Sequence, residues 1–138
     1  MRGKRSAVAL IVAALACLHG CGASDGPQAV SGSVTYQGKP LGHGSVTFLT
    51  TVGERGPAGG ALITDGRFEI PAARGLVPGT YRVAISAPEP GGQLTAAEKA
   101  AGASPKARET MPAKYNAATE LTAEIRVGAA NRFDFNLE

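Results

Sequence analysis

The chain of 138 residues is poor in the residue types on which much protein chemistry depends. Its two cysteines, Cys17 and Cys21, lie near the amino terminus, so disulfides, thiolate metal sites and cysteine nucleophiles are not expected beyond them. Tryptophan is absent, aromatic residues make up 5% of the chain, and His43 is the only histidine after residue 20. Stacking platforms for nucleobases are therefore scarce.

An excess of positive charge is also missing from most of the chain. Of the 14 basic residues, Arg2, Lys4 and Arg5 precede every acidic residue and supply the formal net charge of +3. The remaining 11 basic residues match the 11 acidic residues, so the net charge from residue 21 onward is zero. A nucleic-acid-binding domain needs a basic surface, and no nucleic-acid partner is expected.

The amino-terminal residues have the pattern of a secretory signal. A basic start is followed by an apolar run from Ala7 to Leu18, which is too short to cross a bilayer as a helix. Leu18-His19-Gly20-Cys21 then resembles the lipobox of bacterial lipoproteins. The resemblance implies export across the inner membrane, removal of a signal peptide 1–20, and acylation of Cys21 with chains such as palmitate. Cys17 is the alternative lipidation site.

The implied location is the cell envelope, where the lipid would anchor the protein facing the periplasm or the exterior. Two acyl chains hold a protein stably on a membrane, since each buried methylene contributes about 0.8 kcal/mol. Residues 21–28 are small and polar and are expected to form a flexible tether after the lipidated cysteine. The folded domain is then predicted over residues 29–138.

From residue 29 onward, apolar and polar residues alternate in short runs, which predicts half-buried β-strands. Asp65-Gly66 between two runs is typical of a tight hairpin, because these residues tolerate positive φ. A glycine-rich loop is expected over 53–60. No long amphipathic helix interrupts the runs, so the expected fold is an all-β antiparallel sandwich or barrel. The seven predicted strands are 30–36, 45–50, 61–64, 67–70, 80–87, 121–127 and 132–137.

A long connection, 88–119, separates the last two predicted strands from the others. Thr95-Ala96-Ala97-Glu98 fits a capping box and predicts one short helix over 96–101. The following residues 104–119, called the strap, are expected to extend over the sandwich. Long loops on rigid scaffolds often carry binding, whereas a strap that only covers an open sheet edge is the alternative. The candidate partner-binding residues of the strap are Lys106, Arg108, Met111, Lys114 and Tyr115.

Several strand motifs resemble those of carboxypeptidase regulatory-like domains, which are transthyretin-like (prealbumin-type) proteins. Leu76 to Val83 matches a Leu-x-Pro-Gly-x-Tyr-x-Val pattern, and similar matches occur at 30–41, 64–68 and 112–115. The resemblance implies a seven-stranded antiparallel Greek-key sandwich and a non-catalytic module of a bacterial lipoprotein. Structural roles are expected for Tyr81, whose hydroxyl could form a tyrosine corner, and for the turn residues Gly79 and Gly66.

No set of catalytic or metal-ligating residues is apparent. His43 is the only candidate histidine base, no Gly-x-Ser-x-Gly elbow is present, and the carboxylates fit solvated strand faces. No cofactor is expected, and the predicted function is a binding or structural module with an envelope protein or a glycan as partner. The alternatives are a carbohydrate-binding module, which needs exposed aromatics, and a small transthyretin-like hydrolase, which needs His43 beside an arginine and a carboxylate.

Overall fold

The structure is a computed structural model that describes residues 26–51 and 57–138. The predicted signal peptide, Cys17, Cys21 and the first residues of the tether lie outside the described residues, as do residues 53–56 of the predicted 53–60 loop.

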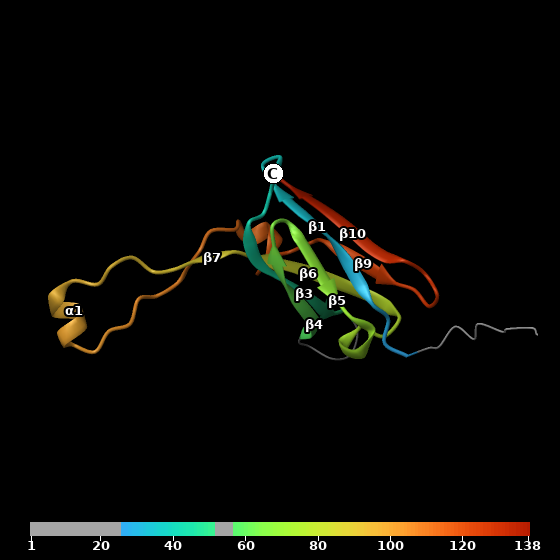
Figure 1. The fold of residues 1–138 in the computed structure, drawn as a ribbon, viewed down its shortest axis with the longest axis horizontal. Coiled ribbons are helices and arrows are strands. Elements are labelled where there is room, and N and C mark those ends of the chain that lie inside the picture. The colour runs from blue at the N-terminus through green and yellow to red at the C-terminus, as the bar shows by residue number, and fades with distance from the viewer. Residues whose placement is uncertain (1–25, 52–56) are drawn as a thin grey trace, which may run out of the picture.

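One curled β-sheet dominates the fold, which is all-β as expected (Figure 1). Its strand order is β10-β1-β5-β4-β3-β6-β9, with β2 paired to β1 alone. The sheet curls until its two end strands, β9 and β10, come together. The strands are β1 (Val30–Tyr36), β2 (Lys39–Pro40), β3 (His43–Thr50), β4 (Pro57–Thr64), β5 (Arg67–Ile70), β6 (Gly79–Ser86), β9 (Thr122–Ile125) and β10 (Asn131–Leu137).

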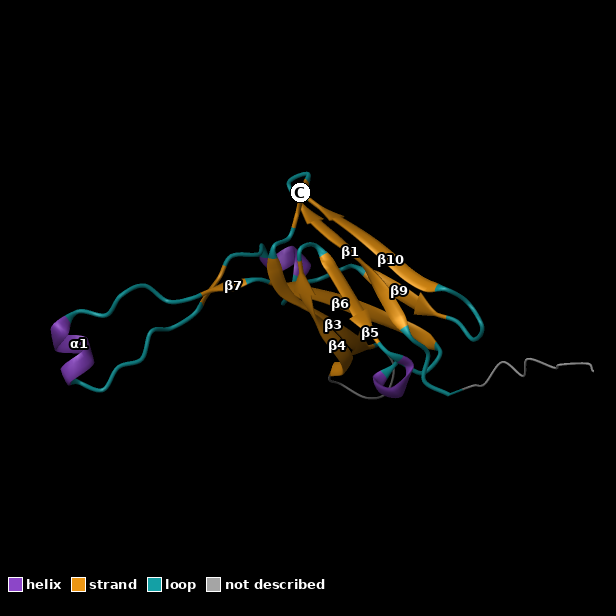
Figure 2. Ribbon diagram, in the orientation of Figure 1, coloured by secondary structure: helices purple, strands orange, loops and turns teal. Residues whose placement is uncertain are grey.

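The remaining elements are short (Figure 2). β7 (Pro88–Glu89) and β8 (Arg108–Glu109) form a separate two-stranded sheet, and α1 (Ala96–Ala100) lies between them in the chain. Two 3-10 turns, η1 (Ala72–Arg74) and η2 (Ala113–Tyr115), follow β5 and β8.

The core fills the concave side of the curled sheet. Alternate residues of each long strand point into it, and Val34, Val46 and Phe48 are fully buried. Phe48 contacts the Phe68 ring at 6.3 Å and the Tyr81 ring, edge to face, at 6.4 Å between centroids. The period-two pattern of the sequence thus marked the buried faces correctly, because a strand directs successive side chains to opposite sides.

The first and last strands pair in parallel, whereas an entirely antiparallel sheet was expected. Val30 lies opposite Asn131 and Tyr36 opposite Leu137, while the other strand pairs are antiparallel. On the outer face, the Ser33 hydroxyl donates to Asp134 Oδ1 at 2.6 Å. Local alternation predicts which residues are buried but carries no information on strand direction, so this part of the prediction was wrong.

A tight turn holds the consecutive strands β4 and β5 in register. Asp65 and Gly66 have φ of 49° and 73°, which confirms the predicted hairpin between β4 and β5. A Cβ on Gly66 would also lie 2.7 Å from Pro40 Cβ, so glycine is required here for space as well as for conformation.

The predicted glycine-rich loop is partly wrong, because β4 begins at Pro57 rather than at residue 61. Gly59 and Gly60 lie inside this strand. A Cβ on Gly59 would lie 2.8 Å from Leu76 Cδ2, and one on Gly60 would lie 2.5 Å from the Val46 carbonyl oxygen. These glycines therefore permit close approach within the sheet and do not mark a turn.

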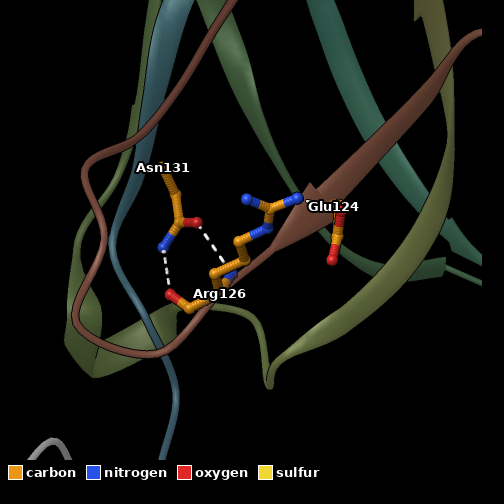
Figure 3. Close-up of polar contacts among 3 residues, drawn as sticks. All are labelled: Glu124, Arg126 and Asn131. Atoms are coloured by element: carbon orange, nitrogen blue, oxygen red, sulfur yellow. Dashed lines mark hydrogen bonds and ion pairs between the residues drawn. The ribbon is translucent and has the colours of Figure 1, made fainter.

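A side-chain amide closes the connection between β9 and β10 (Figure 3). Asn131 Oδ1 accepts a hydrogen bond from the Arg126 backbone N–H at 2.9 Å, and Asn131 Nδ2 donates to the Arg126 carbonyl at 3.0 Å. The amide thus pairs with a backbone as a neighbouring strand would, and Asn131 is only 7% exposed. The nearby Arg126–Glu124 ion pair is exposed and contributes little.

Candidate functional site

Residues 88–110 form an arm that projects from the body and carries α1 at its tip (Figure 1, Figure 2). The strap, 104–119, was expected to extend over the sandwich, and this prediction is wrong for its residues 104–110, which belong to the arm. The predicted short helix is confirmed as α1. Its capping box is complete, with Thr95 Oγ1 accepting from the Glu98 N–H at 3.3 Å and Glu98 Oε2 accepting from the Thr95 N–H at 2.8 Å.

The candidate strap residues divide between the arm and the core. Lys106 and Arg108 are exposed on the returning leg of the arm. Met111 and Tyr115 are buried, with 5% and 9% of their surfaces exposed, and belong to the hydrophobic core. Lys114 is exposed on the body, with its Nζ 4.8 Å from the centre of the Tyr115 ring.

Tyr115 fixes the end of β10. Its hydroxyl donates to the Glu138 carbonyl and accepts from the Glu138 N–H, both at 2.8 Å. The Tyr115 hydroxyl therefore pairs with the backbone of Glu138, just beyond the end of β10, as a neighbouring strand would. This role could not be recognised from the sequence, since the residues around Tyr115 show no strand or helix periodicity.

Glu109 anchors the arm to the body. Its Oε1 accepts hydrogen bonds from the Ala87 N–H at 3.0 Å and from the Met111 N–H at 2.9 Å, and its Oε2 accepts from the Ser86 hydroxyl. Partial burial opposes ionisation, but these hydrogen bonds outweigh it and lower the pKa of Glu109. Thr110 Oγ1 adds a bond of 2.6 Å to the Ala87 carbonyl. The base of the arm is thus held at the end of β6.

We expect Glu109→Gln to loosen the base of the arm by about 1 kcal/mol, since it replaces charge-assisted bonds at a partly exposed site. Because folding lowers the Glu109 pKa, the ionised carboxylate stabilises the base above its unfolded pKa. That stabilisation is lost as the pH falls through the lower folded value. The protection of the Ala87 and Met111 amides against hydrogen exchange, relative to the intrinsic rate at each pH, should therefore fall on acidification in the parent protein, and much less so in the variant.

The matched control is Glu89→Gln, which removes the same charge from the opposite leg of the arm, at the exposed β7. It should leave exchange at Ala87 and Met111 unchanged. Equal acid sensitivity of these two amides in the parent and in Glu109→Gln would show that another group controls the base of the arm.

The two legs of the arm touch backbone to backbone. A Cβ on Gly91 would lie 2.7 Å from the Lys106 backbone nitrogen and would overlap the Lys106 carbonyl. Only glycine fits at this point. Together with the β7–β8 pairing, in which Pro88 lies opposite Glu109, this contact keeps the arm narrow near its base.

A second surface feature surrounds Leu62 on the outer face of β4. Leu62 is 78% exposed, the most exposed large hydrophobic side chain in the described ranges. Three shallow hollows, of about 520, 330 and 370 Å³, all border it. The first reaches Arg74 and Glu69, the second reaches Arg67 and Arg132, and the third reaches His43 and Pro88. The exposed face therefore extends to the base of the arm.

His43 is exposed at the start of β3 and lines the hollow next to Pro88. Of the described residues, neither an arginine nor a carboxylate lines this hollow with it. Within 26–51 and 57–138, no group of three potential metal-ligating side chains is present. Among the same residues, no helix is long and apolar enough to span a bilayer.

The predicted structural residues lie at the turns where the sequence places them. Tyr81 is buried, and its hydroxyl donates to the Val77 carbonyl at 2.8 Å, which is the contact of a tyrosine corner. Burial raises the pKa of this hydroxyl. Gly79, with φ of 156°, precedes it at the start of β6.

The chain has no match among family models, curated proteins or solved structures.

Proposed function

We propose that the protein is a non-catalytic, lipid-anchored module of the bacterial cell envelope that presents the arm to a protein partner. The observation that carries the proposal is the arm itself. Its base is anchored by Glu109, whereas no residue of α1 is buried against the body. A segment that leaves its own domain with a fixed base and an uncovered tip is suited to contact another molecule.

The finer fold that we propose is a seven-stranded Greek-key sandwich of the transthyretin-like type. Its support is the path of seven strands in the curled sheet, with the first strand next to the last. The hydroxyl contact of Tyr81 after the Pro78-Gly79 turn also agrees with the motif on which the resemblance rests.

The start of the described chain and the tip of the arm lie at positions that agree with anchoring at Cys21. The described chain begins at the end of the long axis opposite α1 (Figure 1). A tether that joins Cys21 to β1 would thus hold the domain with the arm directed away from the membrane. This orientation makes the tip of the arm accessible to other envelope proteins.

Neither alternative function gains a specific observation. Carbohydrate binding needs exposed rings, but Tyr81 and Tyr115 are buried and Tyr36 is half-buried. A small hydrolase needs His43 beside an arginine and a carboxylate, and the hollow at His43 has neither in the described part of the chain.

The proposal is tested by cross-linking the full-length protein in cells and purifying it through a tag. With the arm variant Lys106→Ala/Arg108→Ala, the amount of a discrete cross-linked partner that is recovered should fall at least about tenfold, because two exposed charged contacts are removed. The matched control, Lys39→Ala/Arg82→Ala, removes the same charge from exposed positions of the body and should retain the partner. In parallel, Cys21→Ser should move the protein out of the detergent phase.

Two results would count against the proposal. A partner that both double variants retain, or both lose, would show that the arm is not the recognition element. A Cys21→Ser protein that still partitions with detergent would exclude Cys21 as the lipidated residue.

A further inference from the structure

The arm is exposed over most of its length. Every residue from Thr95 to Thr110 is exposed, and α1 has no buried residue (Figure 1). At the tip, the Ala103 N–H donates to the Glu98 carbonyl at 3.0 Å, and the other hydrogen bonds of α1 likewise stay within residues 95–103. The tip can therefore lose its structure without disturbing the packing of the body.

A helix of this kind opens at little cost. α1 has five residues, and isolated helices shorter than about 12 residues are marginal in water even when they are rich in alanine. Its capping box offsets only part of this cost. Proteolysis of a native protein follows the population of the locally opened state, and exposed loop tips are preferred sites of cleavage. The tip is therefore expected to be the most protease-sensitive part of the described chain.

Lys99 is the basic residue at the tip. A protease holds its substrate as an extended chain, so several residues on both sides of the cut bond must be open. For the Lys99–Ala100 bond, these neighbours lie beyond the contact between Gly91 and Lys106. The bonds after Lys106 and Arg108 lie next to β8, which is paired with β7 and anchored to the body. The Lys99–Ala100 bond is thus the most accessible bond after a basic residue of the arm.

The basic residues of the body are less open to a protease. In the described ranges they lie in strands or 3-10 turns, apart from Arg126, whose N–H and carbonyl both bond to the Asn131 side chain. Lys39 is exposed but precedes Pro40, whose ring replaces the N–H at the bond to be cut. These residues are Lys39, Arg67, Arg74, Arg82, Lys114, Arg126 and Arg132.

We propose that the arm is a processing site for a protease of the cell envelope that cleaves after lysine, and that the cut bond is Lys99–Ala100. Water adds across the C–N bond, so Lys99 gains a carboxylate and Ala100 gains an amine, and no oxidant or reductant is consumed. This inference rests on the proposed role of the arm and names its regulation. The cut divides α1 between two separate legs, so the tip is no longer presented as one helix.

The two parts of the cut chain stay together. The part that begins at Ala100 supplies β9, which pairs with β6, and β10, which pairs with β1 from Val30 to Tyr36. The Phe135 ring of this part lies 6.3 Å from the Phe68 ring of the other. Its buried hydrophobic residues all belong to the common core, namely Met111, Tyr115, Ala123, Ile125, Phe135 and Leu137. Cleavage therefore changes the arm and leaves the body assembled.

The first test treats the purified full-length protein in detergent with a limiting amount of trypsin and identifies each product by its mass. Among the described residues, cleavage after Lys99 should be at least about tenfold faster than after any other. A cut after Arg55, which lies outside the described residues, is recognised by its different masses. The two products should elute together until they are denatured. Their melting temperature should rise with protein concentration, because two chains must reassemble, whereas that of the uncut protein should not.

The second test follows processing in cells through a carboxyl-terminal tag. The parent protein should give a tagged fragment of residues 100–138 beside the uncut chain. Lys99→Gln should abolish this fragment, and the matched control Lys39→Gln, also at an exposed position, should retain it. Neither change should alter the melting temperature of the uncut protein, since both side chains are exposed.

Three results would overturn the proposal. They are a first cut in the body or after Lys106 or Arg108, products that separate without denaturant, and a parent protein that stays uncut in cells. Regulation has its own measurement, because a divided α1 cannot form its helix. Trypsin-cut protein should recover at least about tenfold less of the cross-linked partner than uncut protein, and equal recovery would show that cleavage does not regulate the arm.

The failure of this inference and that of the proposed function can be distinguished. If Lys106→Ala/Arg108→Ala lowers the recovery of a partner but no fragment of residues 100–138 forms in cells, the arm is a recognition element and the processing inference is wrong. If the fragment forms and depends on Lys99 while no partner depends on the arm, the proposed function is wrong and the cleavage site is retained.

Discussion

Replacing Gly32 with alanine is expected to lower the free energy of unfolding by about 3 kcal/mol and the melting temperature by about 10 °C. Gly32 lies in the middle of β1, beside β10 and below the ring of Phe68. A Cβ there would lie 2.7 Å from Phe68 Cε1 and Cζ and would overlap the Phe133 carbonyl oxygen. The ring and the backbone of β10 would both have to move, and the strands on either side constrain them.

Gly42→Ala is the matched control, because nothing lies within 4 Å of a Cβ at that position. It should melt within about 2 °C of the parent, since only the conformational freedom of the unfolded chain changes. Thermal unfolding followed by circular dichroism compares the three proteins. A Gly32→Ala protein as stable as the control would contradict the close parallel pairing of β1 with β10.

Replacing Asn131 with aspartate is expected to cost about 3 kcal/mol near neutral pH, more than Asn131→Ala, for which about 2 kcal/mol is expected. The native amide donates from Nδ2 to the Arg126 carbonyl and, at 3.4 Å, to the Ala129 carbonyl. A carboxylate would point an ionised oxygen at both carbonyls in a position that is almost fully buried. Alanine only leaves these groups without their partner.

The pH dependence separates the two variants. Burial and the facing carbonyls raise the pKa of the introduced carboxyl, so folding takes up a proton between the unfolded and folded pKa values. The stability of Asn131→Asp should therefore recover toward that of the parent as the pH falls to about 4, when a protonated carboxyl can donate to Arg126. Asn131→Ala should show no such recovery. Urea unfolding at several pH values measures both, and parallel curves would contradict this account of the connection.

Features set by neighbouring residues could be predicted from the sequence. The buried faces of β1, β3 and β6, the hairpin at Asp65-Gly66 and the capping box of Thr95 each depend on residues a few positions apart. Periodicity and turn chemistry are local properties, so they can be recognised without knowledge of the rest of the fold.

Features set by distant residues could not be predicted. The direction of the arm depends on bonds from Glu109 to Ser86 and Ala87, more than 20 positions away in the chain. The burial of Met111 and Tyr115 depends on the same path, since the chain returns to the core after the arm. Gly59 and Gly60 were interpreted as part of a loop. Glycines that allow strands to approach closely look the same in a sequence as glycines that form a turn. The Leu62 face was missed for a similar reason, as its hollows form only where β1, β3, β4 and β5 adjoin.

The parallel pairing of β1 with β10 also governs when the protein can fold. The Ser33–Asp134 hydrogen bond joins residues 101 positions apart, and such non-local contacts make folding slow, roughly milliseconds to seconds for all-β domains. During synthesis, β1 emerges early and has no partner on that side until residues 131–137 follow. The sheet is therefore expected to be complete only when the last strand of the chain is available.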